Sequence, residues 1–272
     1  MTPAQLIAAR YGITAASEPA EWNAVLDCLL SHRSMRSYED KPVGDELLHT
    51  LMAAAQSAPN SSNLQCWSVV AVRDAATKAA LAASCGNQAY VAKAPLFLVW
   101  LADFARLDSV ARQQGVEPKA MNYLEMLLMA SIDTALAAQA FSTAAESVGL
   151  GTVFIGGIRN NVDQVASLLK LPPKVAPVFG LCVGYPDAKA AAGSIRPRLA
   201  QSVVVHQEQY QAIDLAQAGA DYDRAMARYQ QVQGMPPEAW TKRSAARVRD
   251  AASLNGRDRL RGQLLEMGFR LD

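Results

Sequence analysis

Residues 149–161, GLGTVFIGGIRNN, decide how this chain is expected to fold. The segment Gly149-Leu150-Gly151 is typical of a helix end, because glycine readily adopts the left-handed conformation that closes a helix. The next four residues are apolar and partly β-branched, as in a short strand, and they run directly into Gly156-Gly157. Asn160 or Asn161 can then cap a following helix. The segment therefore predicts a helix, a strand, a paired glycine and a second helix in succession.

The preceding segment, roughly residues 119–149, has the longest helical pattern in the chain. Asp133 is its only charge between Met126 and Ala145. A helix that is apolar nearly all round must be covered on most sides, either by its own domain or by a second subunit. Ser131, Thr134 and other polar residues interrupt the apolar run, which argues against a membrane-spanning helix.

Further strands are predicted over residues 65–73, 95–101 and 177–185, which are short, apolar and rich in β-branched side chains. A helix carrying Trp22, Val25 and Leu29 is expected to end near Ser31, and a second helix follows Pro42. Strands that alternate with helices, with consecutive helices at both ends, indicate an α+β or α/β protein with one sheet between helical layers. We expect a single domain.

The overall charge gives no indication of a nucleic-acid partner. The 272 residues carry 26 basic and 25 acidic side chains, and only residues 241–272 are clearly basic. A domain built for nucleic acid has a much stronger basic bias. With 51% hydrophobic residues and no basic N-terminal segment followed by an apolar run, the chain is expected to be cytoplasmic, without a secretory signal or a membrane partner.

The cysteines and histidines indicate neither disulfides nor metal. Cys28, Cys66, Cys85 and Cys182 show no CxxC spacing, so they are interpreted as mostly buried thiols in a reducing compartment. The three histidines lack matching cysteine or carboxylate spacings. No metal site is therefore predicted.

The basic segment His32-Arg33-Ser34-Met35-Arg36 is the first candidate for a binding site. Guanidinium groups bind phosphate through paired hydrogen bonds and keep their charge. A second pair in Arg196-Pro197-Arg198 makes a two-sided anion clamp conceivable, although the sequence does not place the two segments together. The alternative is a solvated basic cap on the negative end of a helix.

Two turns could also border a ligand. Asn60-Ser61-Ser62-Asn63 has the composition of any polar turn, whereas Gly156-Gly157 would let a planar ligand or another backbone approach closely. The chain contains no GxGxxG, Walker or GxSxG motif and no obvious nucleophile or acid–base pair. That combination fits an enzyme whose chemistry resides in a bound cofactor.

Six segments in order resemble one known family. They are HRSMRSYEDKPV, SAPNSSNLQCWSV, CGNQAYV, GLGTVFIGGIRNNVDQVASLLKLP, VFGLCVGYP and RPRL, which begin at residues 32, 57, 85, 149, 178 and 196. Together they resemble the oxygen-insensitive NADPH nitroreductase and flavin reductase group of the FMN-dependent nitroreductase superfamily. The resemblance runs from about residue 23 to about 210 and continues weakly to the C-terminus.

The resemblance implies an α+β nitroreductase-like fold, with a central, mainly antiparallel sheet wrapped by helices, in an intertwined homodimer that binds FMN at the subunit interface. It implies one FMN-binding domain over residues 1–272, with a helical C-terminal excursion from about 211. The residues expected to contact FMN are His32, Arg33, Ser34, Arg36, Asn60, Gln88, Phe154, Ile155, Gly156, Gly157, Arg196 and Arg198.

Within that set, His32, Arg196 and Arg198 would neutralise the phosphate, and Arg36 would face the flavin ring. The implied reaction is ping-pong: NADPH or NADH delivers hydride to FMN N5, and a nitroaromatic, quinone or free flavin then takes the electrons. No side chain would be catalytic in itself. The alternative is an FMN-binding paralogue with a structural or sensory role.

Ser62, Asn63 and Arg257 would border the acceptor site. The family has serine where Asn60 stands, and this hydrogen-bonding replacement is expected to keep the flavin contact. It has an aromatic residue where Asn63 stands, so acceptor stacking can differ here. The arginine-rich loop associated with NADPH in relatives corresponds to residues 233–237, QGMPP, in this chain. This departure leaves the choice between NADPH and NADH open.

Overall fold

The computed structural model describes residues 1–272, apart from the side chains of Lys189 and Ala191. The chain forms two compact units, each made from two separate stretches of sequence. We call Met1–Arg33 with Ala191–Ser253 the helical unit, and Ser34–Ala190 with Leu254–Asp272 the sheet unit. The single domain expected from the sequence, with its helical excursion from about residue 211, stays a prediction.

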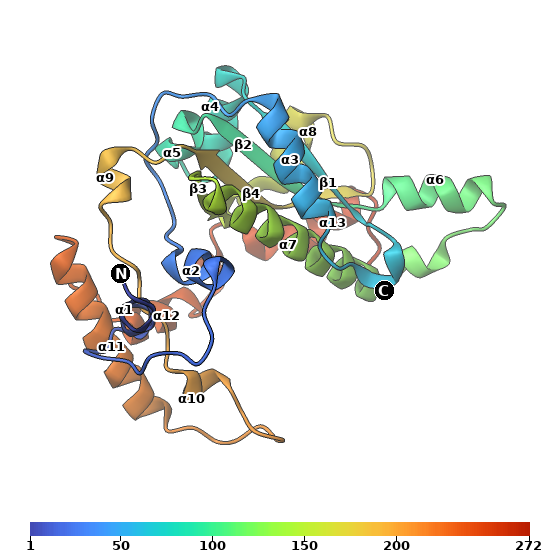
Figure 1. The fold of residues 1–272 in the computed structure, drawn as a ribbon. Coiled ribbons are helices and arrows are strands. Elements are labelled where there is room, and N and C mark those ends of the chain that lie inside the picture. The colour runs from blue at the N-terminus through green and yellow to red at the C-terminus, as the bar shows by residue number, and fades with distance from the viewer. The chain divides into compact units, whose positions relative to one another are not determined.

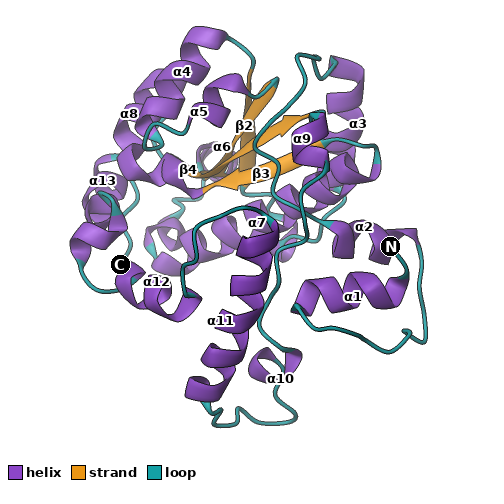
Figure 2. Ribbon diagram, turned by 90° about the vertical axis from the view of Figure 1, so that its left-hand side faces the viewer, coloured by secondary structure: helices purple, strands orange, loops and turns teal.

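The sheet unit is built on four antiparallel strands in the order β1-β2-β4-β3. Figure 2 labels three of them, β2, β4 and β3. They are β1 (Trp67–Val72), β2 (Leu96–Asp103), β3 (Gly151–Ile155) and β4 (Val175–Gly184). Each strand coincides, within a few residues, with a segment predicted from the sequence. An antiparallel sheet combined with many helices confirms the α+β class.

Helices of the sheet unit lie on both sides of these strands. They are α3 (Asp45–Gln56), α4 (Ala75–Ser84), α5 (Ala89–Lys93), α6 (Ala105–Gln113), α7 (Leu124–Ser147), α8 (Val162–Leu169) and α13 (Leu260–Glu266). Short 3-10 segments are η1 (Ser61–Asn63), η2 (Lys119–Asn122), η3 (Gly156–Asn161) and η5 (Arg257–Arg259). Two sequence boundaries of the units fall within short elements, α9 (Ala188–Ala191) and η4 (Ala251–Leu254).

The alternation of side chains along β2 separates two hydrophobic layers. Phe97, Val99 and Leu101 pack into a cluster with residues of α4, α5 and α8, whereas Leu96, Leu98 and Trp100 pack with α3 and α7. Successive strand residues point to opposite faces, so a strand that is apolar throughout must be covered twice. The expected arrangement of one sheet between helical layers is confirmed.

The helical unit contains α1 (Pro3–Tyr11), α2 (Ala24–Ser31), α10 (Gln201–Val204), α11 (Leu215–Val232) and α12 (Trp240–Arg247) (Figure 1). Helix α1 was not predicted from the sequence. Its signals are a capping box between Thr2 and Gln5 and a proline in its first turn. An irregular stretch separates α11 from α12 at Gly234-Met235-Pro236-Pro237.

Two helix starts differ in the structure from those predicted from the sequence. Trp22 lies outside α2, because the Asn23 side chain accepts the N–H groups of Val25 and Leu26 and so caps the helix one residue later. Asn161 occupies the N-cap position of α8, but its side-chain amide donates to Gln164 instead of capping.

Helix α7 is only partly covered. Among the described helices, it alone has the length and apolar composition of a membrane span, and 33% of that stretch is buried. Ala137 and Phe141 lie in the core beside the sheet. Another side of α7 carries four exposed apolar residues, spaced four positions apart: Leu124, Leu128, Ile132 and Leu136. This packing makes α7 a core helix with one apolar stripe exposed in the monomer.

Candidate functional site

The paired glycine follows the buried edge strand β3. The side chain of Ile155 is 1% exposed and belongs to the core, so only its backbone can face a ligand. Phe154 points the other way, with 38% of its side chain exposed, and its ring contacts Phe179 edge-on at 5.3 Å. The chain then turns into η3 at Gly156 and Gly157.

The two glycines are required for different reasons. A Cβ on Gly157 would lie 2.6 Å from the Cys85 carbonyl oxygen and 2.9 Å from Nε2 of Gln88. A Cβ on Gly156 would meet only guanidinium nitrogens, of Arg159 at 3.7 Å and Arg257 at 3.9 Å. Gly157 is therefore needed for close packing, whereas Gly156 faces a space bordered by two cations.

Gln88 is held beside Gly157 by hydrogen bonds at both ends of its amide. Its Nε2 donates to the Cys85 carbonyl at 2.9 Å, and the Tyr90 hydroxyl donates to its Oε1. The Arg36 guanidinium lies over the Tyr90 ring, 5.8 Å from its centre. Tyr90 therefore links two residues that the sequence assigned to one cofactor site.

The segment carrying Arg36 is fixed to β3. The Met35 N–H donates to the Thr152 carbonyl at 2.9 Å, and the Met35 side chain packs tightly over Gly151. Ser34 and Arg36, on either side of it, are exposed. Alternation along this extended segment thus anchors Met35 and leaves Ser34 and Arg36 available to a ligand.

Arg159 is a candidate that the sequence analysis missed. Its guanidinium donates to the Val178 carbonyl, and burial lowers the pKa of the group. Its position three residues after Gly156 could have drawn attention to it. Arg257, which donates Nε to the Leu254 carbonyl, reaches the same glycine from the distant segment η5. The structure thus places Arg257 beside Gly156, and its assignment to the acceptor site stays a prediction.

The polar turn at residues 60–63 is held by α7. The Ser61 N–H donates to both carboxylate oxygens of Asp133, at 3.0 and 3.3 Å, and Asp133 is 2% exposed. Ser62 and Asn63 have φ angles of +50° and +54° and are exposed. Oδ1 of Asn60 is buried and has no hydrogen-bond partner among the described residues. Such an acceptor fits a group that binds there.

The basic segments of the helical unit lie together. The Arg10 guanidinium donates to the carbonyls of His32 at 2.9 Å and Arg196 at 3.1 Å. Arg33 donates to the Gly193 carbonyl. The exposed Arg198 donates to the carbonyls of its own segment, at 3.2 and 3.3 Å. The structure thus joins the two segments that the sequence left separate.

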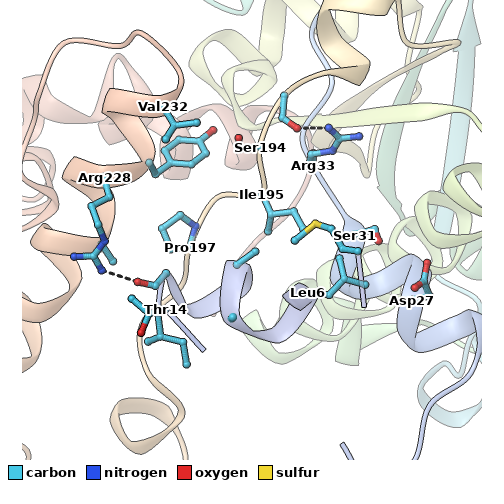
Figure 3. A pocket seen from close by; sticks show the side chains of 18 residues that line it. Leu6, Thr14, Asp27, Ser31, Arg33, Ser194, Ile195, Pro197, Arg228 and Val232 are labelled. Atoms are coloured by element: carbon cyan, nitrogen blue, oxygen red, sulfur yellow. Dashed lines mark hydrogen bonds between the residues drawn. The ribbon is translucent and has the colours of Figure 1, made fainter. Parts of the chain in front are cut away.

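A cavity of about 690 Å³ borders these basic segments (Figure 3). Arg33, Ser194 and Pro197 line it from the two segments, and Arg228 lines it from α11. Leu6 and Ile195 contribute apolar surface. The cavity therefore combines an apolar wall with guanidinium groups.

Burial disfavours the thiolate forms of two cysteines in the sheet unit, Cys85 and Cys66. Burial raises the pKa of Cys85 to about 12 and that of Cys66 to about 11. A thiol with so high a pKa stays protonated and unreactive. No cluster of three or more potential metal ligands occurs among the residues that the structure describes.

Comparison with known proteins identifies the family. The family model described as "Nitroreductase family" matches residues 29–185, and that described as "Nitroreductase family, C-terminal domain" matches residues 196–272. This chain belongs to the nitroreductase family. The basic segments, the polar turn and the paired glycine of this nitroreductase all fall inside the matched ranges.

Individual relatives support the same assignment. The chain is 43% identical over 209 residues to an oxygen-insensitive NADPH nitroreductase of Salmonella typhimurium, which covers 77% of this chain and 83% of the relative. B. megaterium NfrA2 is structurally similar, with a TM-score of 0.86, 36% identity and coverage of 92% and 100%. A Vibrio harveyi NADPH:FMN oxidoreductase complexed with NAD+ has a TM-score of 0.81, 34% identity and coverage of 91% and 99%. The nitroreductase-like fold is confirmed.

The predicted site residues divide between the two units. The helical unit contains His32, Arg33, Arg196 and Arg198, and the sheet unit contains Ser34, Arg36, Asn60, Ser62, Asn63, Gln88, Phe154, Ile155, Gly156, Gly157 and Arg257. Within the sheet unit, hydrogen bonds join the turn at 60–63 to Asp133 and Gln65. The assignment of these residues to one FMN site stays a prediction.

Proposed function

We propose that this nitroreductase is an NAD(P)H-dependent FMN oxidoreductase that reduces nitroaromatics, quinones or free flavin by a ping-pong mechanism. The observation that carries the proposal is the space beside Gly156, which two guanidinium groups border. Its relatives are named as an NADPH nitroreductase and an NADPH:FMN oxidoreductase. When bound, FMN would supply the two-electron transfer between donor and acceptor.

The residues present fit FMN in three respects. Gly156 lacks a side chain where a flat ring would need close backbone approach, and no atom of the described residues, its chain neighbours aside, lies closer than 3.7 Å to its missing Cβ. The buried Oδ1 of Asn60 has no hydrogen-bond partner among the described residues and could accept a hydrogen bond from the cofactor. Arg196 and Arg198 provide guanidinium cations suited to a phosphate, and His32 provides an imidazole beside them.

The remaining residues would orient the ligands and stabilise charge. Arg36, held over Tyr90, would place a permanent positive charge beside the ring and so favour its reduced, more negative form. Ser62, Asn63 and Arg257 would border the acceptor. A protein side chain that forms a covalent intermediate is not required, which agrees with the protonated state of Cys85.

We further propose that the protein is a cytoplasmic homodimer. The exposed stripe of Leu124, Leu128, Ile132 and Leu136 on α7 is the apolar surface that a second copy would cover. Light scattering should give twice the monomer mass, and Ile132→Glu should lower it. A monomeric wild-type protein would refute the dimer. The buried thiols Cys66, Cys85 and Cys182 suit a reducing compartment.

The reductase activity is tested by anaerobic titration. The protein reconstituted with FMN should be yellow, and NADPH or NADH should bleach it within seconds; a nitroaromatic or quinone should then restore the colour. A protein that does not bind FMN refutes the proposal. A yellow protein that neither donor bleaches refutes the reductase activity and favours a structural or sensory role. Values of kcat/KM for both nucleotides would settle the preferred donor.

A further inference from the structure

We infer that Arg10 of α1 is a positioning residue for the phosphate-binding cations, because its side chain joins the His32-Arg33 segment to the Arg196-Pro197-Arg198 segment. The inference rests on the proposed function, which takes the FMN phosphate as the ligand of these cations. Helix α1 precedes residue 29, where the match to the family begins. A helix outside the matched region would therefore organise a site inside it.

The geometry of Arg10 supports this role directly. The residue is 8% exposed. Its Nη2 donates to the carbonyls of Leu30 at 2.8 Å and His32 at 2.9 Å, and its Nη1 donates to the Arg196 carbonyl at 3.1 Å. In return, the Arg198 N–H donates to the Arg10 carbonyl at 2.7 Å. One residue thus sets the distance between two segments that are far from it in sequence. Arg196 lies 186 positions after Arg10, and His32 lies 22 positions after it.

The contact with the end of α2 explains why an arginine suits this position. The last carbonyls of a helix lack intrahelical donors and carry partial negative charge. Helix α2 has no basic residue in its own last turn. The Arg10 guanidinium supplies both the donors and the charge from a neighbouring helix, and its rigid fork fixes where His32 and Arg33 leave α2.

The second segment is also held on its far side. The Tyr222 hydroxyl donates to the Pro197 carbonyl at 2.9 Å, and the Arg196 guanidinium lies over the Tyr229 ring at 5.5 Å. Both tyrosines belong to α11. Arg196 and Arg198 are therefore confined between α1 and α11.

Helix α1 itself is fixed to α11. It ends at Gly12, where a Cβ would lie 2.7 Å from Cβ of Ala225 and 3.2 Å from Cβ of Pro197. The Arg228 guanidinium donates to the Gly12 carbonyl at 2.6 Å, at the edge of the cavity in Figure 3. The support for Arg10 is thus closely packed and hydrogen-bonded, and a clamp held in this way would be ordered before a ligand binds. A site ordered in advance binds more tightly, because less freedom is lost on association.

The test separates phosphate binding from ring binding. FMN and riboflavin share the ring, but only FMN carries the phosphate. We expect Arg10→Gln to weaken FMN binding by about 10- to 100-fold, the cost of losing several hydrogen bonds from a charged donor, while riboflavin binding changes less than about threefold. Fluorescence titration of the apo-protein measures both affinities without any need for turnover.

Matched variants control for a general effect on the helical unit. Arg243→Gln removes a charge of the same unit whose ion pair is with Glu238 at 3.6 Å, and it should leave the ratio of FMN to riboflavin affinity unchanged. Arg10→Lys keeps the charge and the long side chain but cannot span all three carbonyls, so it should show an intermediate loss. If Arg10→Gln does not fold, Arg10→Lys decides the question.

Two outcomes overturn different statements. If the wild-type protein binds neither FMN nor riboflavin, the proposed function fails. If the wild-type protein prefers FMN and the folded Arg10 variant keeps the wild-type affinity ratio, the positioning role fails while the proposed function stands. An equal loss for both ligands also refutes the positioning role, because it indicates a general disruption of the site.

Discussion

Replacing Gly157 by alanine should destabilise the protein more than the same change at Gly156. The new methyl at position 157 would lie 2.6 Å from the Cys85 carbonyl oxygen, about 0.8 Å inside the 3.4 Å at which ordinary contact begins. The obstacle is backbone, so it cannot move aside as a flexible side chain would. Nε2 of Gln88, at 2.9 Å, would be displaced as well.

The expected cost follows from these two contacts. Overpacking of a core position costs about 1–3 kcal/mol, and losing the hydrogen bond from Gln88 to Cys85 adds about 1 kcal/mol. A total of about 2–4 kcal/mol corresponds to a fall in Tm of roughly 5–15 °C, because 1 kcal/mol shifts Tm by about 2–4 °C at this size.

Thermal unfolding of the apo-protein, followed by circular dichroism, measures this effect without the cofactor. Gly156→Ala is the matched control, since its methyl meets only guanidinium tips at 3.7 and 3.9 Å and its Tm should stay within about 2 °C of the wild type. The same control should lose FMN affinity, because its methyl fills the space assigned to the cofactor. Equal Tm values for the two variants would refute this reasoning.

Three further outcomes are expected. Asp133→Ala should lower the free energy of unfolding in urea by about 1–3 kcal/mol, because the Ser61 N–H loses its acceptor. Asp133→Asn keeps an acceptor oxygen and should lower this free energy less. Equal losses for the two variants would contradict the prediction. Hydrogen bonds from Arg112 and Lys174 lower the pKa of Asp108 to about 2. The stability that Asp108 adds is therefore present above about pH 4 and disappears towards pH 2. In urea unfolding, the free energy of unfolding should fall less between about pH 4 and pH 2 for Asp108→Asn than for the wild type. Ellman's reagent at pH 8 should label Cys28 alone in the native protein and all four cysteines in guanidinium, because burial raises the pKa values of Cys66 and Cys85; native labelling of either would contradict this.

The sheet and its covering helices could be predicted because periodicity carries that information. β2 is apolar at every position from Leu96 to Ala102, which is the pattern of a strand covered on both faces. Helix α1 escaped prediction because it is nine residues long and its apolar pattern is weak. Its capping box was a local signal that could have revealed it.

The candidate site was predictable in composition but not in geometry. The sequence identified the two basic segments, yet their proximity depends on Arg10, whose function is a tertiary contact with three carbonyls. Arg159 escaped because an isolated arginine on a turn is usually solvated, and only folding places it beside Gly156. The different roles of Gly156 and Gly157 likewise depend on what lies opposite each residue.

The left-handed conformations of Ser62 and Asn63 have a consequence for directed evolution of acceptor preference. Such angles cost about 1–2 kcal/mol for residues other than glycine, asparagine and aspartate. A saturation library at positions 62 and 63 would therefore be sampled unevenly, with glycine, asparagine and aspartate enriched among folded variants and valine, isoleucine and threonine depleted. New aromatic contacts to an acceptor are better sought from neighbouring exposed positions with ordinary backbone angles, such as Ser61.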